Sequence, residues 1–556
     1  MNSRTVLYVF ATFFILLDLF SCGPQTKNGS LHEDKVFEKA FHHAEQANEA
    51  LVRCNAYMKA WLSYADPNTG LVPRRIDHEK DRTIWNVRDC AADNYPFLVL
   101  TSFFTNRNMY NGVMHDMLNN EIRLTSRVKS LPDTYSFSKQ DFEHETVSMD
   151  RIIFGTSEYL KDGLMPLTEW LGQSPWSERM LTMLDDLDEY VDVAGNLNRD
   201  LGNSPEAEVN GELLQVLSRV YWMTGEQKYL DWATQIGDFF LLGEGYPLTS
   251  FDYLRLRDHG CELVGGLCEL YVTVHFADKE KKQAYKKPLF GILDYILEYG
   301  RNEDGLFYNA INPQTNETVD DGLADTWGYT LNGYYSIYMI DKVERYKEAV
   351  NQVFKNLNKY RNYNWERNGA DGYADAVEGA INLYNRMEIE SVAEWIDSEI
   401  QVMWSMQDSS HRENAQQWKN NGIIEGWYGD GNFARTSIMY KLWKTMGAHL
   451  QPWRPEIKLG AVEKKDTLYI AVGSSVPWKG KLYFDRPRHS TIMNLPEDWP
   501  RINQFPEWFI VTPKSKYFLV DVGDGTSSEL DGQSLIQGVE LELTANEMKR
   551  LKLFID

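Results

Sequence analysis

A repeated pattern of two apolar stripes joined by a short turn constrains the fold of this chain more than any other feature. In residues 209–240, apolar side chains recur at three- and four-residue spacing, stop at a Thr-Gly-Glu turn and then resume, which predicts a helical hairpin. One hairpin cannot bury its apolar face alone, so successive hairpins must stack, as an open solenoid or a closed ring. We expect the ring. Similar patterns occupy 34–105, 157–191, 260–299, 325–357 and 372–406, and a last helix is expected near 432–446.

The hydrophobic period changes after Pro452-Trp453-Arg454-Pro455, where apolar and polar residues begin to alternate as in β-strands. The fold class we expect is therefore mainly α, an (α/α) helical-hairpin toroid at 33–452 with a C-terminal all-β sandwich domain at 456–556. Residues 124–156 fit neither pattern and are interpreted as an insertion, a kind of segment that often borders a site. The strands are expected at 468–472, 481–484, 509–511, 518–522 and 539–543.

The N-terminus has the features of a lipoprotein signal. Arg4 precedes a short apolar run at 6–17, too short to span a bilayer, and Leu19-Phe20-Ser21-Cys22-Gly23 is typical of a lipobox. We expect a signal peptide at 1–21, lipidation at Cys22 and a polar tether at 22–32. These features predict a lipid-anchored protein of the bacterial cell envelope, in the outer membrane and facing the periplasm, although an ordinary cleaved signal peptide is the alternative.

Charge and cysteine content narrow the possible partners. The chain has 57 Lys and Arg against 81 Asp and Glu, a net charge of −24 that disfavours nucleic-acid binding. Cys54, Cys90, Cys261 and Cys268 lack metal-binding spacing. Cys54 and Cys90 are interpreted as core residues, and Cys261 and Cys268, seven residues apart, as one face of a helix. We expect no cofactor, and the sequence leaves metal binding open.

Unusual polar residues recur at the start of the first helix of each hairpin. In a toroid these starts share one rim, so their side chains would converge on one cavity, although any one of them could simply cap a helix. Aromatic residues, 13% of the chain, flank the same positions and suit the apolar faces of sugar rings, although many must fill the core. The candidate substrate-binding residues are Arg88, Asn94, Glu208, Asn210, Arg257, Glu262, Asp325, Trp327, Asp375, Trp427 and Asn432.

The chain resembles a group of carbohydrate-active enzymes. The residues that carry the resemblance are the helical phrase Thr224-Gly225-Glu226-Gln227-Lys228-Tyr229-Leu230 and the loop Asp66-Pro67-Asn68-Thr69-Gly70-Leu71, together with the β domain and the lipoprotein signal. These are similar to the α/α-toroid enzymes of polysaccharide-degrading Bacteroidetes. That group includes polysaccharide lyases, unsaturated glucuronyl hydrolases and the dehydratases of ulvan breakdown. No segment matches one family's catalytic signature, so the resemblance implies an enzyme of glycans without assigning residues.

The reaction expected from the rim is β-elimination on uronic-acid-containing oligosaccharides or polysaccharides, possibly sulfated, by a lyase or a terminal-uronate dehydratase. Elimination needs a base, an acid and a cation that stabilises the enolate, and the candidates are His259, Tyr329, Arg435 and His144. Arg255, Arg257 and His259 would attract an acidic glycan. The first alternative is a glycoside hydrolase using two carboxylates, and the second is a glycan-binding lipoprotein without catalysis. Carboxylates available for hydrolysis include Glu206, Glu208, Asp321, Asp325, Asp371, Asp375 and Asp430.

Overall fold

The computed structural model describes residues 26–191, 206–408, 422–424 and 430–555. The predicted signal peptide, the lipidation residue Cys22 and the candidate Trp427 lie outside these ranges. Helix α1 (Thr26–Leu62) begins within the segment expected to be the tether. Among the helices of the described ranges, none combines the length and the apolar character needed to cross a membrane.

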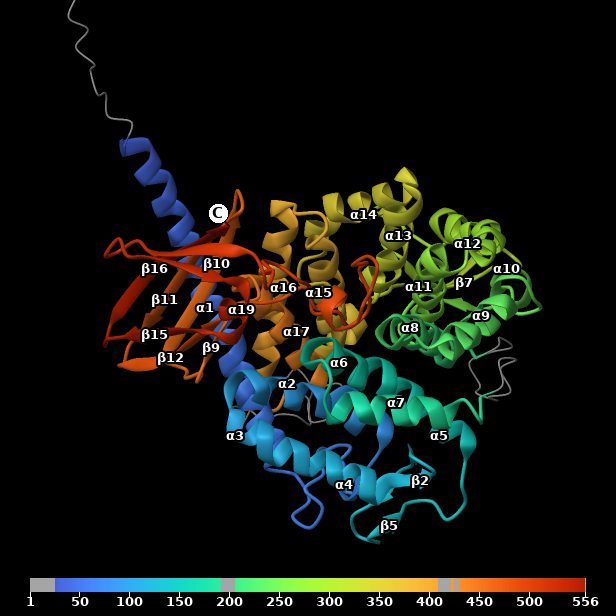
Figure 1. Ribbon diagram of the computed structural model, residues 1–556. Coiled ribbons are helices and arrows are strands. Elements are labelled where there is room, and N and C mark those ends of the chain that lie inside the picture. Colours follow the sequence, from blue (N-terminus) through green and yellow to red (C-terminus); the bar gives the residue numbers. More distant parts are fainter. Residues whose placement is uncertain (1–25, 192–205, 409–421, 425–429, 556) are drawn as a thin grey trace, which may run out of the picture.

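The inner helices form a closed ring (Figure 1). Each packs on the next, and the last packs on the first, so the toroid expected from the sequence is confirmed and the open solenoid is wrong. In ring order, the inner positions are η2 (Val87–Asn94) with α2 (Tyr95–Thr105), α5 (Met149–Glu158) with η4 (Tyr159–Leu164) and α6 (Met165–Leu171), α8 (Ala207–Thr224), α11 (Cys261–Ala277), α13 (Trp327–Asp341), α15 (Ala370–Tyr384) and α17 (Asp430–Lys444).

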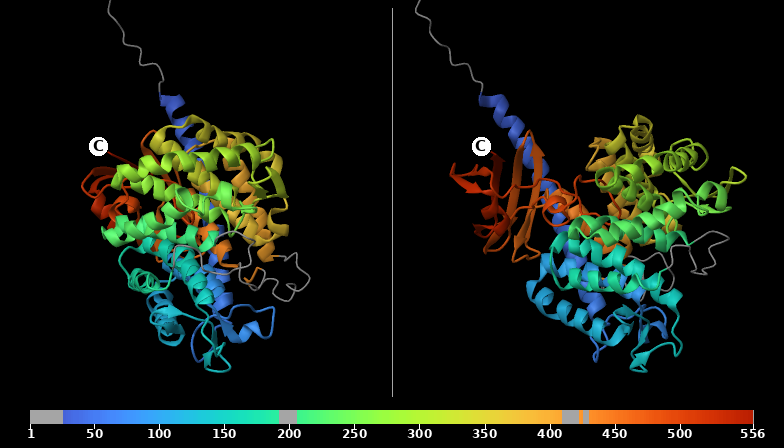
Figure 2. Two further views of the ribbon diagram at one scale, coloured as in Figure 1. Left: turned by 90° about the vertical axis from the view of Figure 1, so that its right-hand side faces the viewer. Right: turned by 45° about the vertical axis from the view of Figure 1, so that its right-hand side comes forward.

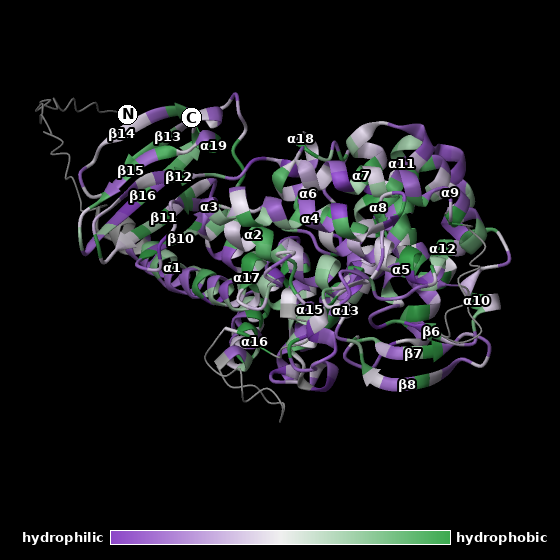
Figure 3. Ribbon diagram, turned by 90° about the horizontal axis from the view of Figure 1, so that it is seen from below, coloured by the Kyte–Doolittle hydropathy of each residue, from purple (hydrophilic) through white to green (hydrophobic). Residues whose placement is uncertain are grey.

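An outer layer of helices surrounds the inner ring. Outer helices bury one stripe, as α14 (Glu344–Asn356) does with Tyr346, Ala349, Val350 and Val353, whereas α11 is buried around nearly its whole circumference. Figure 3 shows the resulting alternation of polar and apolar residues on the outer helices. The other outer helices are α1, α3 (Arg107–Met109), η3 (Tyr110–Met114), α4 (His115–Thr125), α7 (Pro175–Leu187), α9 (Gln227–Leu241), α12 (Lys279–Tyr299) and α16 (Glu390–Asp408).

Glycines allow the inner helices to pack with their backbones in contact. A Cβ on Gly211 of α8 would lie 2.3 Å from the carbonyl carbon of Glu262 in α11. A Cβ on Gly328 of α13 would lie 2.4 Å from the Cα of Gly379 in α15. Any larger residue at these positions would force the helices apart.

The C-terminal domain is an antiparallel sandwich packed against α1 (Figure 2). Leu468, Leu482 and Leu553 are among its fully buried core residues. One sheet has the order β10 (Ile457–Lys464), β11 (Thr467–Ser474), β16 (Glu547–Ile555), β13 (Lys516–Asp521), β14 (Ser527–Asp531), and the other has the order β15 (Val539–Leu543), β12 (Trp478–Tyr483), β9 (His449–Gln451).

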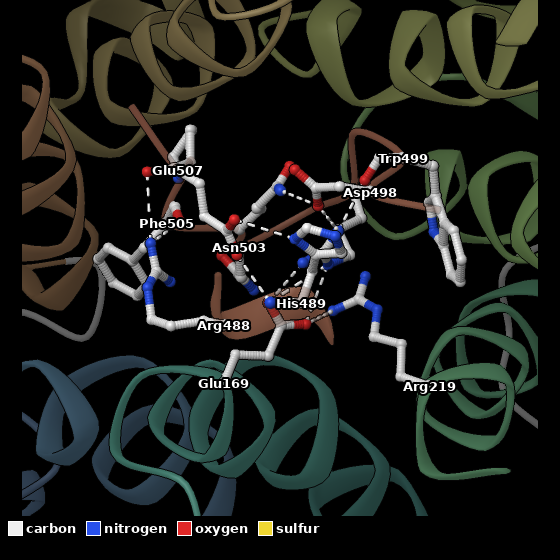
Figure 4. Close-up of polar contacts among 12 residues, drawn as sticks. Glu169, Arg219, Arg488, His489, Asp498, Trp499, Asn503, Phe505 and Glu507 are labelled. Atoms are coloured by element: carbon white, nitrogen blue, oxygen red, sulfur yellow. Dashed lines mark hydrogen bonds and ion pairs between the residues drawn. The ribbon is translucent and has the colours of Figure 1, made fainter. Parts of the chain in front are cut away.

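The sandwich differs from the expected one in two places. Strand β9 lies within the range assigned to the toroid, and the predicted strand 509–511 contributes only an isolated bridge between Ile510 and Asp485. The reason is that residues 486–508, with the short helix α18 (Arg488–Thr491), leave the sandwich and enter the ring of helices (Figure 4), and Phe509 and Val511 then return to the sandwich core. We call this segment the plug.

Short strands border the toroid. The predicted insertion at 124–156 is ordered as paired strands that lead into α5, and a second small sheet lies beside the loop before α11. The strands are β1 (Ile84–Trp85), β2 (Ser126–Val128), β3 (Leu131–Pro132), β4 (Tyr135–Ser136), β5 (Asp141–Phe142), β6 (Leu254–Arg255), β7 (Tyr308–Asn312) and β8 (Glu317–Leu323).

Candidate active site

A cavity of about 160 Å³ lies where the inner helices begin. It receives side chains from η2, η4, α8, α11, α13, α15 and α17, as the rim interpretation predicts. The lining residues are Arg88, Asp93, Glu158, Lys161, Asp162, Glu208, Glu212, Arg255, Arg257, Asp258, His259, Glu262, Tyr329, Glu366, Asp371, Asp375, Asn432, Arg435 and Ile502.

The lining is strongly polar and acidic. It contains ten carboxyl groups against five Lys and Arg side chains and one histidine. Because so many carboxyl groups share a small space and several are buried, some of them must hold a proton near neutral pH. The cavity therefore differs from the positive one that the sequence predicted from Arg255, Arg257 and His259.

His259 is fixed by two carboxylates in the loop before α11. Its backbone has a φ of +65°, an uncommon conformation for a residue with a side chain. Nδ1 contacts Glu208, and Nε2 lies 2.9 Å from an oxygen of Asp258 and 3.2 Å from Nη2 of Arg88. Burial alone would lower the pKa of His259, but Asp258 and Glu208 raise it well above its usual value. The ring is therefore a cation, and it lacks the free nitrogen lone pair that a base requires.

Tyr329 and Arg435 belong to a closed network with Asp375 and Glu378. The tyrosine hydroxyl lies 2.8 Å from both carboxyl groups, and Arg435 Nη2 donates to Asp375 Oδ1 at 2.6 Å. Arg435 also lies 2.7 Å from Glu378 and donates to Asn432 at 2.9 Å. Burial, Asp375 and Glu378 raise the pKa of Tyr329 despite Arg435, so its hydroxyl stays neutral.

The pKa values of two carboxyl groups beside His259 are shifted in opposite directions. Burial alone would raise the pKa of Asp258, but His259, Arg255 and Arg88 hold it well below its usual range. Burial raises the pKa of Glu262 to about 7, with Asp258 and Glu208 adding to the rise against the effect of Lys161. Asp258 is thus ionised while Glu262 retains its proton up to neutral pH.

The two groups also differ in accessibility. The side chain of Asp258 is 37% exposed, whereas that of Glu262 is 5% exposed. Glu262 Oε1 lies 3.5 Å from Lys161 Nζ, and its buried Oε2 has no hydrogen-bond partner among the described residues. The protonated carboxyl thus has an oxygen left for a ligand.

Further carboxyl groups surround Asp258. Burial, then Asp162 and Asp89, raises the pKa of Asp93, while burial, then Asp375 and Glu366, raises that of Asp371. The charge of Asp258 adds to both shifts, from η2 on one side and from α15 on the other. Asp258 therefore lies between two carboxyl groups whose pKa values are raised, while its own is lowered.

Several predicted residues do not reach the cavity. Asn94 accepts a hydrogen bond from Tyr57, Asn210 donates to the carbonyl of Glu206, and Trp327 is fully buried in the core. Asp325 is buried and outside the lining. Their spacing on the helices was visible in the sequence, but the side each helix turns to the axis was not.

His144 lies in an adjacent pocket rather than in the main cavity. This second pocket, of about 310 Å³, also contains Arg74, Lys80 and Arg151, and Arg88 lines both spaces. The insertion that carries His144 thus borders the site without supplying a group to its centre.

The sequence analysis missed the residues from η4 and the preceding turn. Glu158, Lys161 and Asp162 face the cavity because the helix widens to a π-helical turn at Tyr159–Leu164, which no spacing rule anticipates. Ile502 was also missed, because it comes from the C-terminal domain. The other lining residues absent from the candidate sets were Glu212, Asp258 and Glu366.

A metal site is disfavoured at the group of possible ligands that lines the cavity. Ligand atoms of Glu158, Glu208 and His259 lie within 4.8 Å of one another. Arg88, however, lies 3.5 Å from Glu158 and 3.2 Å from His259 Nε2, so a fixed guanidinium already balances this charge. A metal ion also requires a neutral histidine, and the raised pKa of His259 keeps this ring protonated.

Comparison with known proteins gives distant likenesses only. No family model matches the sequence, and no curated protein matches it. A glycoside hydrolase family 76 mannosidase from Bacteroides thetaiotaomicron is 13% identical, covering 71% of this chain and 99% of its own, with a TM-score of 0.37. Cellobiose 2-epimerase from Bacillus thermoamylovorans is 14% identical (51% and 86% coverage, TM-score 0.35), and a possible family 105 member from Salmonella enterica is 10% identical (52% and 82%, TM-score 0.37).

The elimination reaction predicted from the sequence is wrong. The structures named above are described as glycoside hydrolases and a sugar epimerase. The chain itself supplies the physical reason. His259 is a cation, Tyr329 is neutral and shared between two carboxyl groups, and Arg435 is already occupied, so the base and the free cation that elimination needs are missing among these candidates.

Proposed function

We propose that the protein is a glycoside hydrolase in which Asp258 is the ionised carboxylate and Glu262 is the general acid. The observation that carries this proposal is the opposite direction of their two pKa shifts inside one cavity. Such a divergence is what divides acid from base among neighbouring carboxyl groups. Because the lining is acidic, we infer a neutral sugar at the cleavage site rather than the acidic glycan expected from the sequence.

The chemistry follows from the two protonation states. Glu262 donates its proton to the glycosidic oxygen, so the departing sugar leaves as an alcohol. Asp258 stabilises the positive charge that develops at the anomeric carbon and either attacks that carbon or activates water. His259, held between Asp258 and Glu208, fixes the position and the charge of Asp258.

The lining also suits a ligand rich in hydroxyl groups. Buried oxygens of Glu158, Glu212 and Glu262 have no hydrogen-bond partner among the described residues, so a hydroxyl group that reached them would satisfy them. The expected aromatic platform is weaker than predicted, since Trp327 is in the core and Tyr329 is the aromatic side chain in the described lining. Polar contacts, rather than stacking, would then select the sugar.

The test uses Asp258→Asn and Glu262→Gln on neutral and acidic oligosaccharides and on aryl glycosides. Each variant should lose about 10²–10⁴-fold in kcat on natural glycosidic bonds. Glu262→Gln should recover on aryl glycosides with good leaving groups, which need no protonation, whereas Asp258→Asn should not. Asp252→Asn and Glu280→Gln are exposed, lie outside the cavity lining and serve as matched controls.

Two results would overturn the assignment. Full activity of Asp258→Asn on every cleaved substrate would remove the ionised carboxylate from the mechanism. Tight glycan binding by the wild type without any hydrolysis would favour the non-catalytic glycan-binding protein instead.

A further inference from the structure

The tip of the plug, residues 499–503, lies on the axis of the toroid and is held by successive inner helices. Figure 4 shows Trp499 and Asn503 inside the ring, close to Glu169 and Arg219. Arg501 donates to Glu169 of α6 at 3.0 Å, and Trp499 Nε1 donates to Glu269 of α11 at 3.0 Å. Backbone carbonyls of the tip accept hydrogen bonds from Arg219 of α8 (3.3 Å), Ser336 of α13 (3.2 Å) and Asn382 of α15 (3.1 Å).

The residues that hold the plug are one heptad beyond residues that line the cavity. Two helical turns advance the chain by about 10 Å and return to nearly the same face, so each helix presents one polar residue to the cavity and a second one below it. The pairs are Asp162 and Glu169, Glu212 and Arg219, Glu262 and Glu269, Tyr329 and Ser336, and Asp375 and Asn382.

Ile502 and Asn503 form the junction between these two layers. Ile502 lines the cavity, and Asn503 takes a φ of +59°, a conformation that asparagine tolerates well. The Asn503 amide donates to Asp162 at 2.5 Å and accepts from Arg435 at 3.0 Å, and its backbone N–H donates to Glu378 at 2.6 Å. The C-terminal domain thus supplies the floor of the site.

We propose that this floor makes the cavity a blind pocket, so that the enzyme removes a terminal sugar and does not cut inside a chain. The inference rests on the proposed hydrolase function and adds its specificity. A chain that entered the site along the axis of the toroid would have to continue through the space that residues 499–503 fill. The volume of about 160 Å³ is also below the roughly 300–1,000 Å³ of typical ligand pockets, which suits one sugar unit.

The main experiment follows early products from oligosaccharides of two to six units, labelled at the reducing end with 2-aminobenzamide. The panel contains gluco-, manno-, galacto- and xylo-oligosaccharides and uronate oligosaccharides. A blind pocket predicts one of two product pairs from the first time points. These are free monosaccharide with a labelled chain shorter by one unit, or labelled monosaccharide with an unlabelled chain shorter by one unit. Labelled fragments of several lengths at the start would overturn the blind pocket while leaving hydrolysis intact. Absence of cleavage across the panel would instead overturn the hydrolase and this inference with it.

A second measurement tests whether the floor positions the site. Asn503→Gly keeps the backbone conformation but removes the amide that contacts Asp162 and Arg435, and should raise KM roughly tenfold with little change in kcat. Asn494→Gly is the matched control, because Asn494 also has a positive φ (+53°) in the plug but is exposed. Equal KM values in both variants, at unchanged Tm, would show that the plug is only a structural brace.

Discussion

The protonation of Glu262 makes a prediction about stability that is separate from activity. A buried carboxyl group with its pKa raised from 4.5 to about 7 stabilises the folded state fully below pH 4.5, and this contribution is lost as pH rises through 7. Glu262→Gln, which is neutral at every pH, should therefore match the wild type near pH 4 and exceed it by roughly 3 kcal/mol above pH 8. Urea denaturation across this pH range measures the difference. A difference independent of pH would show that Glu262 is ionised in the folded protein.

The sequence predicted the position of the cavity better than the residues that line it. Recurrence at helix starts correctly brought together Arg88, Glu208, Arg257, His259 and Glu262, because a closed ring places those starts on one rim. The recurrence did not reveal which way each side chain points, so Asn94 and Asn210 were included among the candidates although they turn away from the cavity. The chemical role of each residue was harder to predict than its position. His259 looks like a base in the sequence, and only the placement of Asp258 and Glu208 around it shows that it is a cation.

Helix contacts in the ring depend on the absence of side chains at paired glycines. Gly328→Ala should destabilise the protein by about 1–3 kcal/mol, because the new Cβ would overlap Gly379 and push α13 from α15. Gly112→Ala is the control, since its Cβ would meet nothing within 4 Å and alanine favours helix formation. Equal free energies of unfolding for the two variants would contradict such close packing.

Elements with a clear period were the ones that the sequence predicted well. The hairpins and most C-terminal strands were found because one face of each is buried. The plug was not found, since residues 486–508 have no regular hydrophobic period, form only the one-turn helix α18 and are fixed by contacts with helices hundreds of residues away, such as Arg501 with Glu169. The heptad-spaced polar residues, such as Glu262 and Glu269, are a signal that could have indicated something polar inside the ring.

Because the plug is buried in the toroid, the two domains should unfold together. Arg501→Met leaves Glu169 buried with one fewer partner and should cost about 3–5 kcal/mol. Arg345→Met, which breaks a bidentate pair with Asp294 that is about half exposed, should cost less than about 1 kcal/mol. Calorimetry of the wild type should show a single transition, and two separate transitions would mean that the plug does not couple the domains.

Lipidation at Cys22 stays a prediction.

The most direct test of the proposed hydrolysis is the fate of oxygen from water. Oligosaccharides cleaved in ¹⁸O-labelled water should yield products carrying one labelled oxygen per broken bond, detected by mass spectrometry, and Glu262→Gln should slow this incorporation. Cleavage without label, accompanied by the ultraviolet absorbance of a new carbon–carbon double bond, would contradict hydrolysis and the roles assigned to Asp258 and Glu262.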